Sequence, residues 1–440
     1  MFSRLWQFIR QVIHRMFPFK DVAAVEHIDT PLSNEMIDAL DLWYKMYTDS
    51  PPWLSPGKVK SLNLPYLICS EVARQVKWNI SGKADENRNA QDSPRAEYLK
   101  AEFGKLMQSL RSKLEQACAA GGMTIKPYPK DGHIYFDCAT AWSLYPIAFD
   151  DDGNLKDVIF RDSYQDGKTT YTRLERHTVT DKGISITQRA FRSNNRESIG
   201  VEIPLTDVPQ WAAAEPEALL TDTEGQMFGW FKTANANNVD IDAPMGVAVF
   251  NKAVNIIREA DMQYSRILWE YEGSELAIDV DPTVLRPQMN GRGRQEMPQL
   301  NERLFRGVDL GDDHYQVFSP AIRDSALFNG LNQLFMRVED SCGLARGTLS
   351  DANQEARTAT ELRIVKQRTY ATIADNQRAL EHCLRDVVRA MDKYATMYDL
   401  APAGDYDLSF EWDDSIITDA SQQLGERLEL MSQGLMLSLI

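Results

Sequence analysis

The most constraining feature of this sequence is a very long helical pattern near its C-terminal end. No proline or glycine occurs between Thr358 and Leu400, and apolar residues recur there at the spacing of one helix face. At about 1.5 Å per residue this helix is roughly 60 Å long, whereas globular helices usually have about 8–20 residues. A glycine-marked polar segment, residues 342–357, precedes it. A long rigid helix led by a polar loop is typical of a structural protein rather than a small enzyme.

Length, charge and cysteine usage narrow the class of protein. The 440 residues suffice for about two or three domains. The net charge of −16 argues against sequence-reading DNA binding, which needs a basic surface, but not against a surface along which a polyanion slides. The five cysteines form no CxxC pair, which predicts a reduced, cytoplasmic chain. No apolar run reaches about 18 residues, so we expect no transmembrane span.

The N-terminal residues 1–19 predict an amphipathic helix with basic residues opposite its apolar side. Arg10 and Gln11 interrupt the apolar run and no small-residue cleavage site follows, which argues against a signal peptide. Membrane-surface binding is an alternative. Packing against the rest of the fold or a neighbouring subunit is the favoured interpretation.

The middle of the chain changes from a helical to a strand period. Apolar and polar residues alternate from Met123 to about Pro209, which predicts an antiparallel sheet region. The predicted strands are 123–128, 133–137, 143–149, 155–162, 169–177, 183–191 and 201–205. The predicted helices are 33–47, 64–76, 96–119, 247–271, 320–342 and 419–437, with exposed loops at 81–94 and 210–244, short strands within 273–320 and a strand at 406–412. This order predicts an α+β fold.

Catalytic and cofactor-binding motifs are absent from the sequence. It contains no HExxH, GxSxG, GxGxxG or Walker motif, and we predict no catalytic residue, metal site or cofactor. Asp150–Asn154 resembles part of a calcium loop but lacks the downstream glutamate, so we interpret it as a hairpin turn. Strand alternation places Glu175 and His177 on one face, where they would suit acid–base chemistry. A satisfied polar face is the favoured interpretation of that pair.

A glycine-rich turn carries two arginines and has a third nearby, and the interpretation of this cluster stays open. Arg292 and Arg294 lie within Asn290–Arg294, and Arg286 lies nearby. Such a cluster suits nucleic acid. Because acidic residues are equally frequent around it, a protein–protein surface is at least as well supported.

Eight short motifs occur in order along most of the chain. They are GMTIKPY (122–128), YPIAFD (145–150), YTRLERH (171–177), GWFKTANANNVD (229–240), LWEYE (268–272), GLARGTLS (343–350), TATE (358–361) and FEWDDSI (410–416). In order and spacing they resemble the portal proteins of tailed bacteriophages, in the branch found in siphovirus-like phages of Gram-positive bacteria. None of these motifs is catalytic.

The resemblance implies a portal fold that forms a ring, usually a dodecamer in the virion. The implied regions are a mixed α/β wing (1–246), a first stem helix (247–272), a small α/β clip (273–319), a second stem helix (320–342), a tunnel loop (343–357), a long helix returning to the wing (358–412) and the start of a helical crown (413–440). The apolar end of the sequence, residues 435–440, has no polar cap, so we expect the native protein to continue beyond Ile440.

The resemblance also implies a mechanical rather than enzymatic function. The ring would form a channel at one capsid vertex through which double-stranded DNA is packaged and ejected without sequence reading. Implied partners are terminase, a head-completion adaptor, and the major capsid and scaffolding proteins, with no stable membrane association. The ring would be assembled in the host cytoplasm and reside in the virion. The implied DNA-facing residues are Ser350, Asp351, Asn353, Gln354 and Arg357, and the implied clip docking residues are Arg286, Arg292 and Arg294.

Two alternative functions remain from the residues themselves. One is a carboxylate-based hydrolase that uses the strand face of Glu175 and His177. The other is a non-viral helical scaffold protein. Neither the subunit number of an isolated ring nor the residues that contact each partner follow from the sequence.

Overall fold

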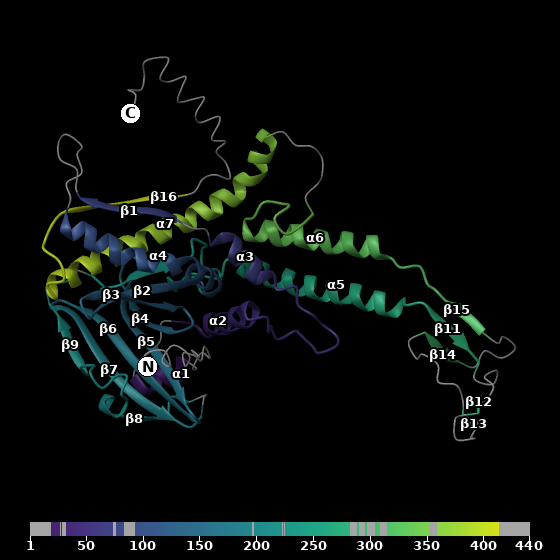
Figure 1. Ribbon diagram of the computed structural model, residues 1–440, viewed down its shortest axis with the longest axis horizontal. Coiled ribbons are helices and arrows are strands. Elements are labelled where there is room, and N and C mark those ends of the chain that lie inside the picture. Colours follow the sequence, from purple (N-terminus) through teal and green to yellow (C-terminus); the bar gives the residue numbers. More distant parts are fainter. Residues whose placement is uncertain are drawn as a thin grey trace, which may run out of the picture.

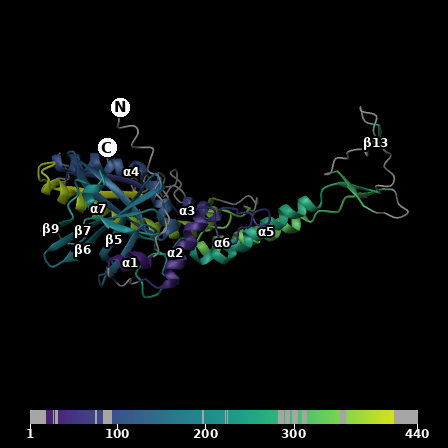
Figure 2. The same ribbon diagram turned by 90° about the horizontal axis from the view of Figure 1, so that it is seen from below.

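A long helical hairpin projects from an α+β body, and Figures 1 and 2 show it leaving the body in both views. The computed structural model describes residues 19–26, 28, 32–73, 76–82, 93–195, 198–221, 223, 225–281, 288–289, 295–296, 304–308, 315–351 and 359–412. The helix predicted over 1–19, the loop predicted over 81–94 and the helix predicted over 419–437 lie wholly or largely outside these residues.

Most of the strand-period segment, from β4 to β8, lies in a six-stranded sheet in the order β4-β5-β6-β7-β8, with β9 from beyond the segment paired to β7. Its neighbouring strands are antiparallel, and glycines with positive φ (Gly167, +59°, and Gly183, +123°) stand in the turns that join β5 to β6 and β6 to β7. The strands are β4 (Leu144–Phe149), β5 (Leu155–Asp166), β6 (Thr169–Thr180), β7 (Gly183–Ser193), β8 (Val201–Ile203) and β9 (Glu217–Leu220), with a short helix η2 (Leu205–Asp207) after β8.

A second sheet, in the order β10-β2-β3, lies against the two longest helices. Its strands are β2 (Gly122–Lys130), β3 (His133–Thr140) and β10 (Gly229–Lys232), and the helices are α4 (Pro94–Ala120) and α7 (Ala359–Met397). Gly229 allows the close approach of β10 to α7, because a Cβ there would lie 2.2 Å from the carbonyl oxygen of Cys383. The very long helix predicted from the sequence, α7, is therefore packed into the body.

A two-stranded antiparallel ribbon covers α4 and α7 (Figure 1). It pairs β1 (Val76–Gly82) with β16 (Tyr406–Trp412), strands that are more than 300 residues apart in the chain. Trp78 of β1 packs edge-on against Phe103 of α4, with ring centroids 5.0 Å apart. The smaller helices α1 (Phe19–Glu26), α2 (Asn34–Tyr47) and α3 (Leu64–Val72) complete the body.

The projecting hairpin consists of α5 (Val254–Gly273) and α6 (Asp324–Cys342). At its base the buried Asp261 accepts hydrogen bonds from Trp53 Nε1 and from the Leu62 amide, each 2.8 Å long, which ties α5 to the body. The described parts of its tip are β11 (Ala277–Val280), β12 (Gln288–Met289), β13 (Gln295–Glu296), β14 (Phe305–Gly307) and β15 (Tyr315–Phe318), in sheets ordered β14-β11-β15 and β12-β13.

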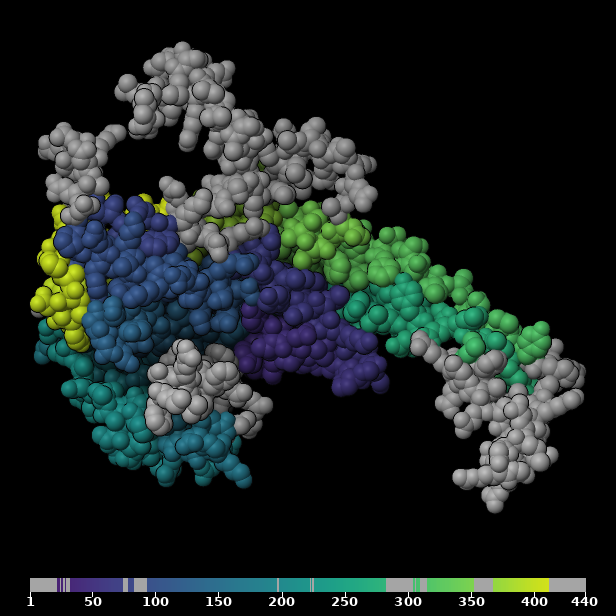
Figure 3. Space-filling model, viewed as in Figure 1, coloured from purple at the N-terminus to yellow at the C-terminus, as the bar shows by residue number. Residues whose placement is uncertain are grey.

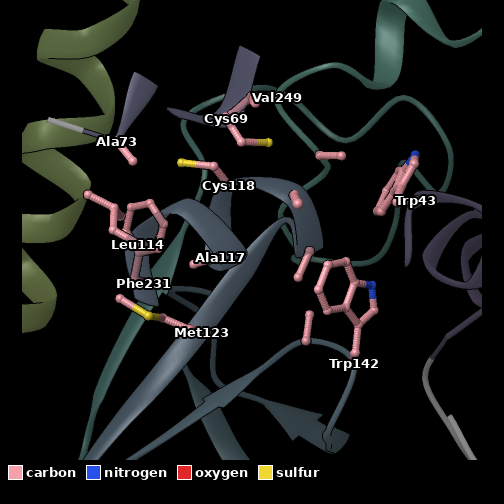
Figure 4. Packing of buried hydrophobic residues seen from close by; sticks show 14 of the residues in the cluster. Trp43, Cys69, Ala73, Leu114, Ala117, Cys118, Met123, Trp142, Phe231 and Val249 are labelled. Carbon is pink, nitrogen blue, oxygen red and sulfur yellow. The ribbon is translucent and has the colours of Figure 1, made fainter. Parts of the chain in front are cut away.

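One hydrophobic core joins the body to the base of the hairpin. Figure 4 shows side chains from α2, α3, α4 and the β2–β3 region meeting there, including Trp43, Cys69 and Trp142. Trp142 Nε1 donates to the carbonyl oxygen of Leu40, so the large ring is buried with its polar atom satisfied.

Several predicted element boundaries were wrong. The helix predicted over 64–76 ends at Val72, because Val76 begins the strand that pairs with β16. The helix predicted from Val247 begins only at Val254, after the short helix η3 (Asn251–Ala253). Residues 247–250 are buried without being helical, so their apolar pattern reports burial alone.

Two further predictions differ from the structure. The helix predicted from residue 320 begins at Asp324, and the segment predicted as loop over 210–244 contains β9 and β10. Both strands are short, and each pairs with a strand that is distant in sequence, so local alternation gives little signal for them. The α+β class and the remaining predicted strands are confirmed.

Candidate functional site

The polar loop after α6 begins at a glycine that ends the helix. Gly343 has φ +71°, and the amide of Leu344 donates to the carbonyl oxygen of Glu339 over 2.8 Å. Thr372 of α7 donates its hydroxyl to the Gly343 carbonyl oxygen at 2.9 Å. A Cβ on Gly343 would lie 2.4 Å from that hydroxyl oxygen, so the end of α6 lies directly against α7.

Further contacts hold the loop to the preceding turn of α7. The amide of Ala345 donates to Thr369 Oγ1 over 2.6 Å. Arg368 binds both the carboxylate and the carbonyl oxygen of Asp340, at 3.0 and 2.8 Å. Arg346 reaches the other carboxylate oxygen of Asp340 at 2.9 Å, and with Arg368 it lowers the pKa of that carboxyl. The beginning of the loop is therefore bound to both helices.

A buried carboxylate stands at the centre of the loop. Glu339 on α6 has no exposed surface. Its Oε1 accepts from the amides of Leu349 (2.6 Å) and Ser350 (2.8 Å), and its Oε2 accepts from the Ser350 hydroxyl (2.8 Å). The Ser350 oxygen in turn accepts from the Gly347 amide at 3.0 Å. Residues 347–350 therefore wrap around one anion.

The residues predicted to face DNA are found in different environments. Ser350 is buried, and its hydroxyl donates to Glu339, so its side chain anchors the loop in this structure. Asp351 is exposed, and its amide donates to Asn332 Oδ1 at 2.8 Å. The other predicted DNA-facing residues and all the predicted clip docking residues lie outside the described residues; they are Asn353, Gln354, Arg357, Arg286, Arg292 and Arg294.

Glu339 is not among the predicted site residues, although its place on the apolar side of a predicted helix was a signal for it. It follows Val338 on the face of α6 that also buries Leu331 and Cys342. A glutamate in such a position must find several donors, because burying an unpaired carboxylate is costly. Its donors come from the loop and could not be identified from the helix pattern alone.

The pair Glu175 and His177 is in contact, as strand alternation indicated. His177 Nε2 lies 2.7 Å from Glu175 Oε1, which also accepts from Lys126 Nζ at 2.6 Å. His177 is packed between Phe160 and Phe228. Burial lowers the pKa of His177, whereas the pKa of Glu175 lies well below its usual range because Lys126 and the neighbouring cations outweigh its own burial. The pair therefore forms a buried ion-pair network that links β2 to β6, and its position gives the hydrolase alternative no support.

The Asp150 segment forms the predicted hairpin turn. Asp150 Oδ1 accepts from the amides of Asp152 (3.1 Å) and Asn154 (2.7 Å), which lowers the pKa of the Asp150 carboxyl despite slight burial. Across the part of the chain that the structure describes, no group of three or more metal-ligating side chains occurs. None of the helices described there is long and apolar enough to cross a membrane.

The α+β body, the projecting hairpin and the loop fixed at their junction define an extended protein of structural type. The profile of a family described as "Phage portal protein, SPP1 Gp6-like" matches residues 72–438. Since this match covers most of the chain, the protein belongs to that family and is a phage portal protein. A search of curated proteins finds no match. Membership agrees with the resemblance found in the sequence and makes the chain a virion component.

Proposed function

We propose that this protein assembles into a ring whose channel lies at one capsid vertex, and that double-stranded DNA is packaged and ejected through it. The observation that carries the proposal is the family match over residues 72–438. In the same proposal the ring, a dodecamer in the virion, docks first terminase and then head-completion and tail proteins, beside the major capsid and scaffolding proteins. Helices α5 and α6 serve as stem, the strands at the hairpin tip as clip, and α7 as the helix that returns to the wing.

Exposed apolar side chains on the hairpin support an assembled state. Trp269 of α5 is 68% exposed and Phe328 of α6 is 47% exposed. Figure 3 shows the outer half of the hairpin extending away from the body. Further exposed apolar residues towards the tip are Leu276, Tyr315, Val317 and Ile322. Such a surface is typical of protein–protein interfaces, and a closed ring would cover it with neighbouring subunits.

The loop between α6 and α7 is the part of the chain best suited to face the channel. It leaves the junction of the hairpin and the body, and from Asp351 onward its sequence is polar, with Asn353, Gln354 and Arg357. Polar side chains of this kind contact the duplex backbone without reading bases. The net charge of −16 repels phosphate, so DNA would not be held firmly and could slide.

Particle imaging of the purified full chain tests the ring. We expect rings with an open axial channel, and we expect Trp269→Ser to weaken them because it removes a large apolar contact. Tyr66→Ser, which alters an exposed aromatic residue on α3 of the body (44% exposed), is the matched control. A compact monomer under all conditions would refute the proposal.

The role of the loop is tested separately. Deleting Asp351–Glu355 should leave rings intact, because the contacts of residues 343–350 with α6 and α7 precede the deletion and only the contact of residue 351 with Asn332 is affected. Packaging or retention of DNA should be impaired. Normal packaging by this variant would show that the loop has no such role.

A further inference from the structure

The buried carboxylate of Glu339 has no role in the proposed channel as described so far. We propose that Glu339 is a positioning residue, which sets where the DNA-facing segment leaves the protein. It does so by fixing residues 343–350 to the junction of α6 and α7. This inference rests on the proposed function for its consequence, but its structural part can be tested without DNA.

The first step concerns the electrostatics of Glu339. Within the described ranges it forms no ion pair, and it accepts three hydrogen bonds from the loop, donated by the Leu349 amide, the Ser350 amide and the Ser350 hydroxyl. A fully buried carboxylate is costly unless fixed donors replace its water. Displacing the loop would remove all three donors together. The charge therefore favours one loop position over any alternative that leaves the carboxylate buried.

The second step concerns the direction that this position imposes. Glu339 binds residues 349 and 350, whereas Asn332, seven residues earlier on α6, accepts from the amide of Asp351 at 2.8 Å. Seven helical residues correspond to about 10 Å along the axis. The chain thus turns at Gly343 and runs back along α6, so the segment after Asp351 starts about three turns before the end of the helix at Cys342.

The third step connects this position to α7. Thr369 and Thr372, on successive turns, bind the Ala345 amide and the Gly343 carbonyl oxygen. The loop base therefore contacts α6 through Glu339 and Asn332, and α7 through two threonines. A shift of α6 relative to α7 would therefore displace Asp351, where the proposed DNA-facing segment begins.

Amide hydrogen exchange on the assembled protein tests the anchor. Glu339→Ala should accelerate exchange at Leu349 and Ser350 by about tenfold to a hundredfold, because hydrogen bonds to a buried charged group are lost. Glu339→Gln, which keeps one oxygen acceptor and can donate to the Ser350 oxygen, should restore most of the protection. Asp324→Asn changes an exposed carboxylate in the first turn of α6, away from the loop, and should leave both amides protected.

DNA packaging tests the positioning role with the same variants. We expect rings to form in each, DNA-filled particles to be lost with Glu339→Ala, and Glu339→Gln to recover them. If Glu339→Ala fails to fold, Ser350→Ala removes only the hydroxyl bonds and should show the same effects more weakly.

Two results would overturn the inference, and neither depends on the other. Unchanged exchange at Leu349 and Ser350 in Glu339→Ala would show that the carboxylate does not hold the loop. Accelerated exchange with normal packaging would show that the anchor does not position DNA contacts. The channel proposal itself would fail differently, through the absence of rings in the unmodified protein.

Discussion

Replacing Arg95 with methionine is expected to release the C-terminal end of α7 from the body. Arg95 lies in the first turn of α4 and is 1% exposed. Its guanidinium donates to three backbone carbonyl oxygens, those of Asp392 (2.9 Å), Ala401 (2.8 Å) and Pro402 (2.9 Å). It also donates to the Asp392 carboxylate (3.1 Å) and to the Thr396 hydroxyl (3.2 Å). One side chain therefore holds the last turns of α7 and the chain that leads into β16.

The magnitude follows from these contacts. A hydrogen bond to a charged group contributes about 1.5–3 kcal/mol, and a buried acceptor left without a donor costs about 1–3 kcal/mol. The contributions are not independent, so we expect a total loss of about 3–5 kcal/mol, as for breaking other buried charge contacts. Methionine fills much of the same volume, which keeps the contribution of an empty cavity small.

Denaturant unfolding and amide exchange in the last turns of α7 measure this loss. Arg378→Met on α7 is the matched control, because Arg378 pairs with Asp375 in an exposed contact (76% and 57% exposed side chains). Such pairs contribute only about 0.2–1 kcal/mol. If Arg95→Met cost no more than Arg378→Met, the assigned role of Arg95 would be refuted.

Two further predictions concern the body. Gly229→Ala should destabilise the protein by about 1–3 kcal/mol in denaturant unfolding, because the new Cβ would meet the Cys383 carbonyl oxygen at 2.2 Å. Gly104→Ala within α4 should instead stabilise it by up to about 1 kcal/mol, because its Cβ would lie at an ordinary van der Waals distance, 3.5 Å, from the Trp78 ring. Equal effects of the two substitutions would contradict this packing. Because the folded pKa of His177 lies below its unfolded value near 6.5, the unfolded chain binds the proton first, and stability should fall as pH drops below about 6.5. His177→Gln keeps a donor to Glu175 and should reduce the fall of the melting temperature between pH 7 and 5. An unchanged dependence of the melting temperature on pH would count against this role of His177.

Much of the fold could be read from local patterns. The period of two identified β2 to β8 with small errors at their ends, and the uninterrupted apolar stripe identified α7. These elements have one face against the core along most of their length, so periodicity reports them faithfully. The strand over 406–412 was also predicted with its observed bounds, although its partner was not.

The errors arose where a segment is defined by a distant partner. Within residues 76–82, Val76 was predicted as helix, residues 81–82 as loop and residues 77–80 were given no element, but the whole segment pairs with β16. Residues 229–232 were assigned to a loop, but they pair with β2 beneath α7. In both cases the backbone hydrogen bonds are satisfied by residues far away in the chain, which no local window contains.

The sequence by itself determined the family, the α+β class and the presence of a polar loop before a very long helix. Only the tertiary structure decided that residues 343–350 of this loop are bound to α6 and α7. Ser350 belongs to the polar segment expected to face DNA, yet it is buried against Glu339, a residue of the preceding helix. The physical reason is that periodicity records which side of an element is apolar. Which donor satisfies a buried charge depends on how two elements meet in space.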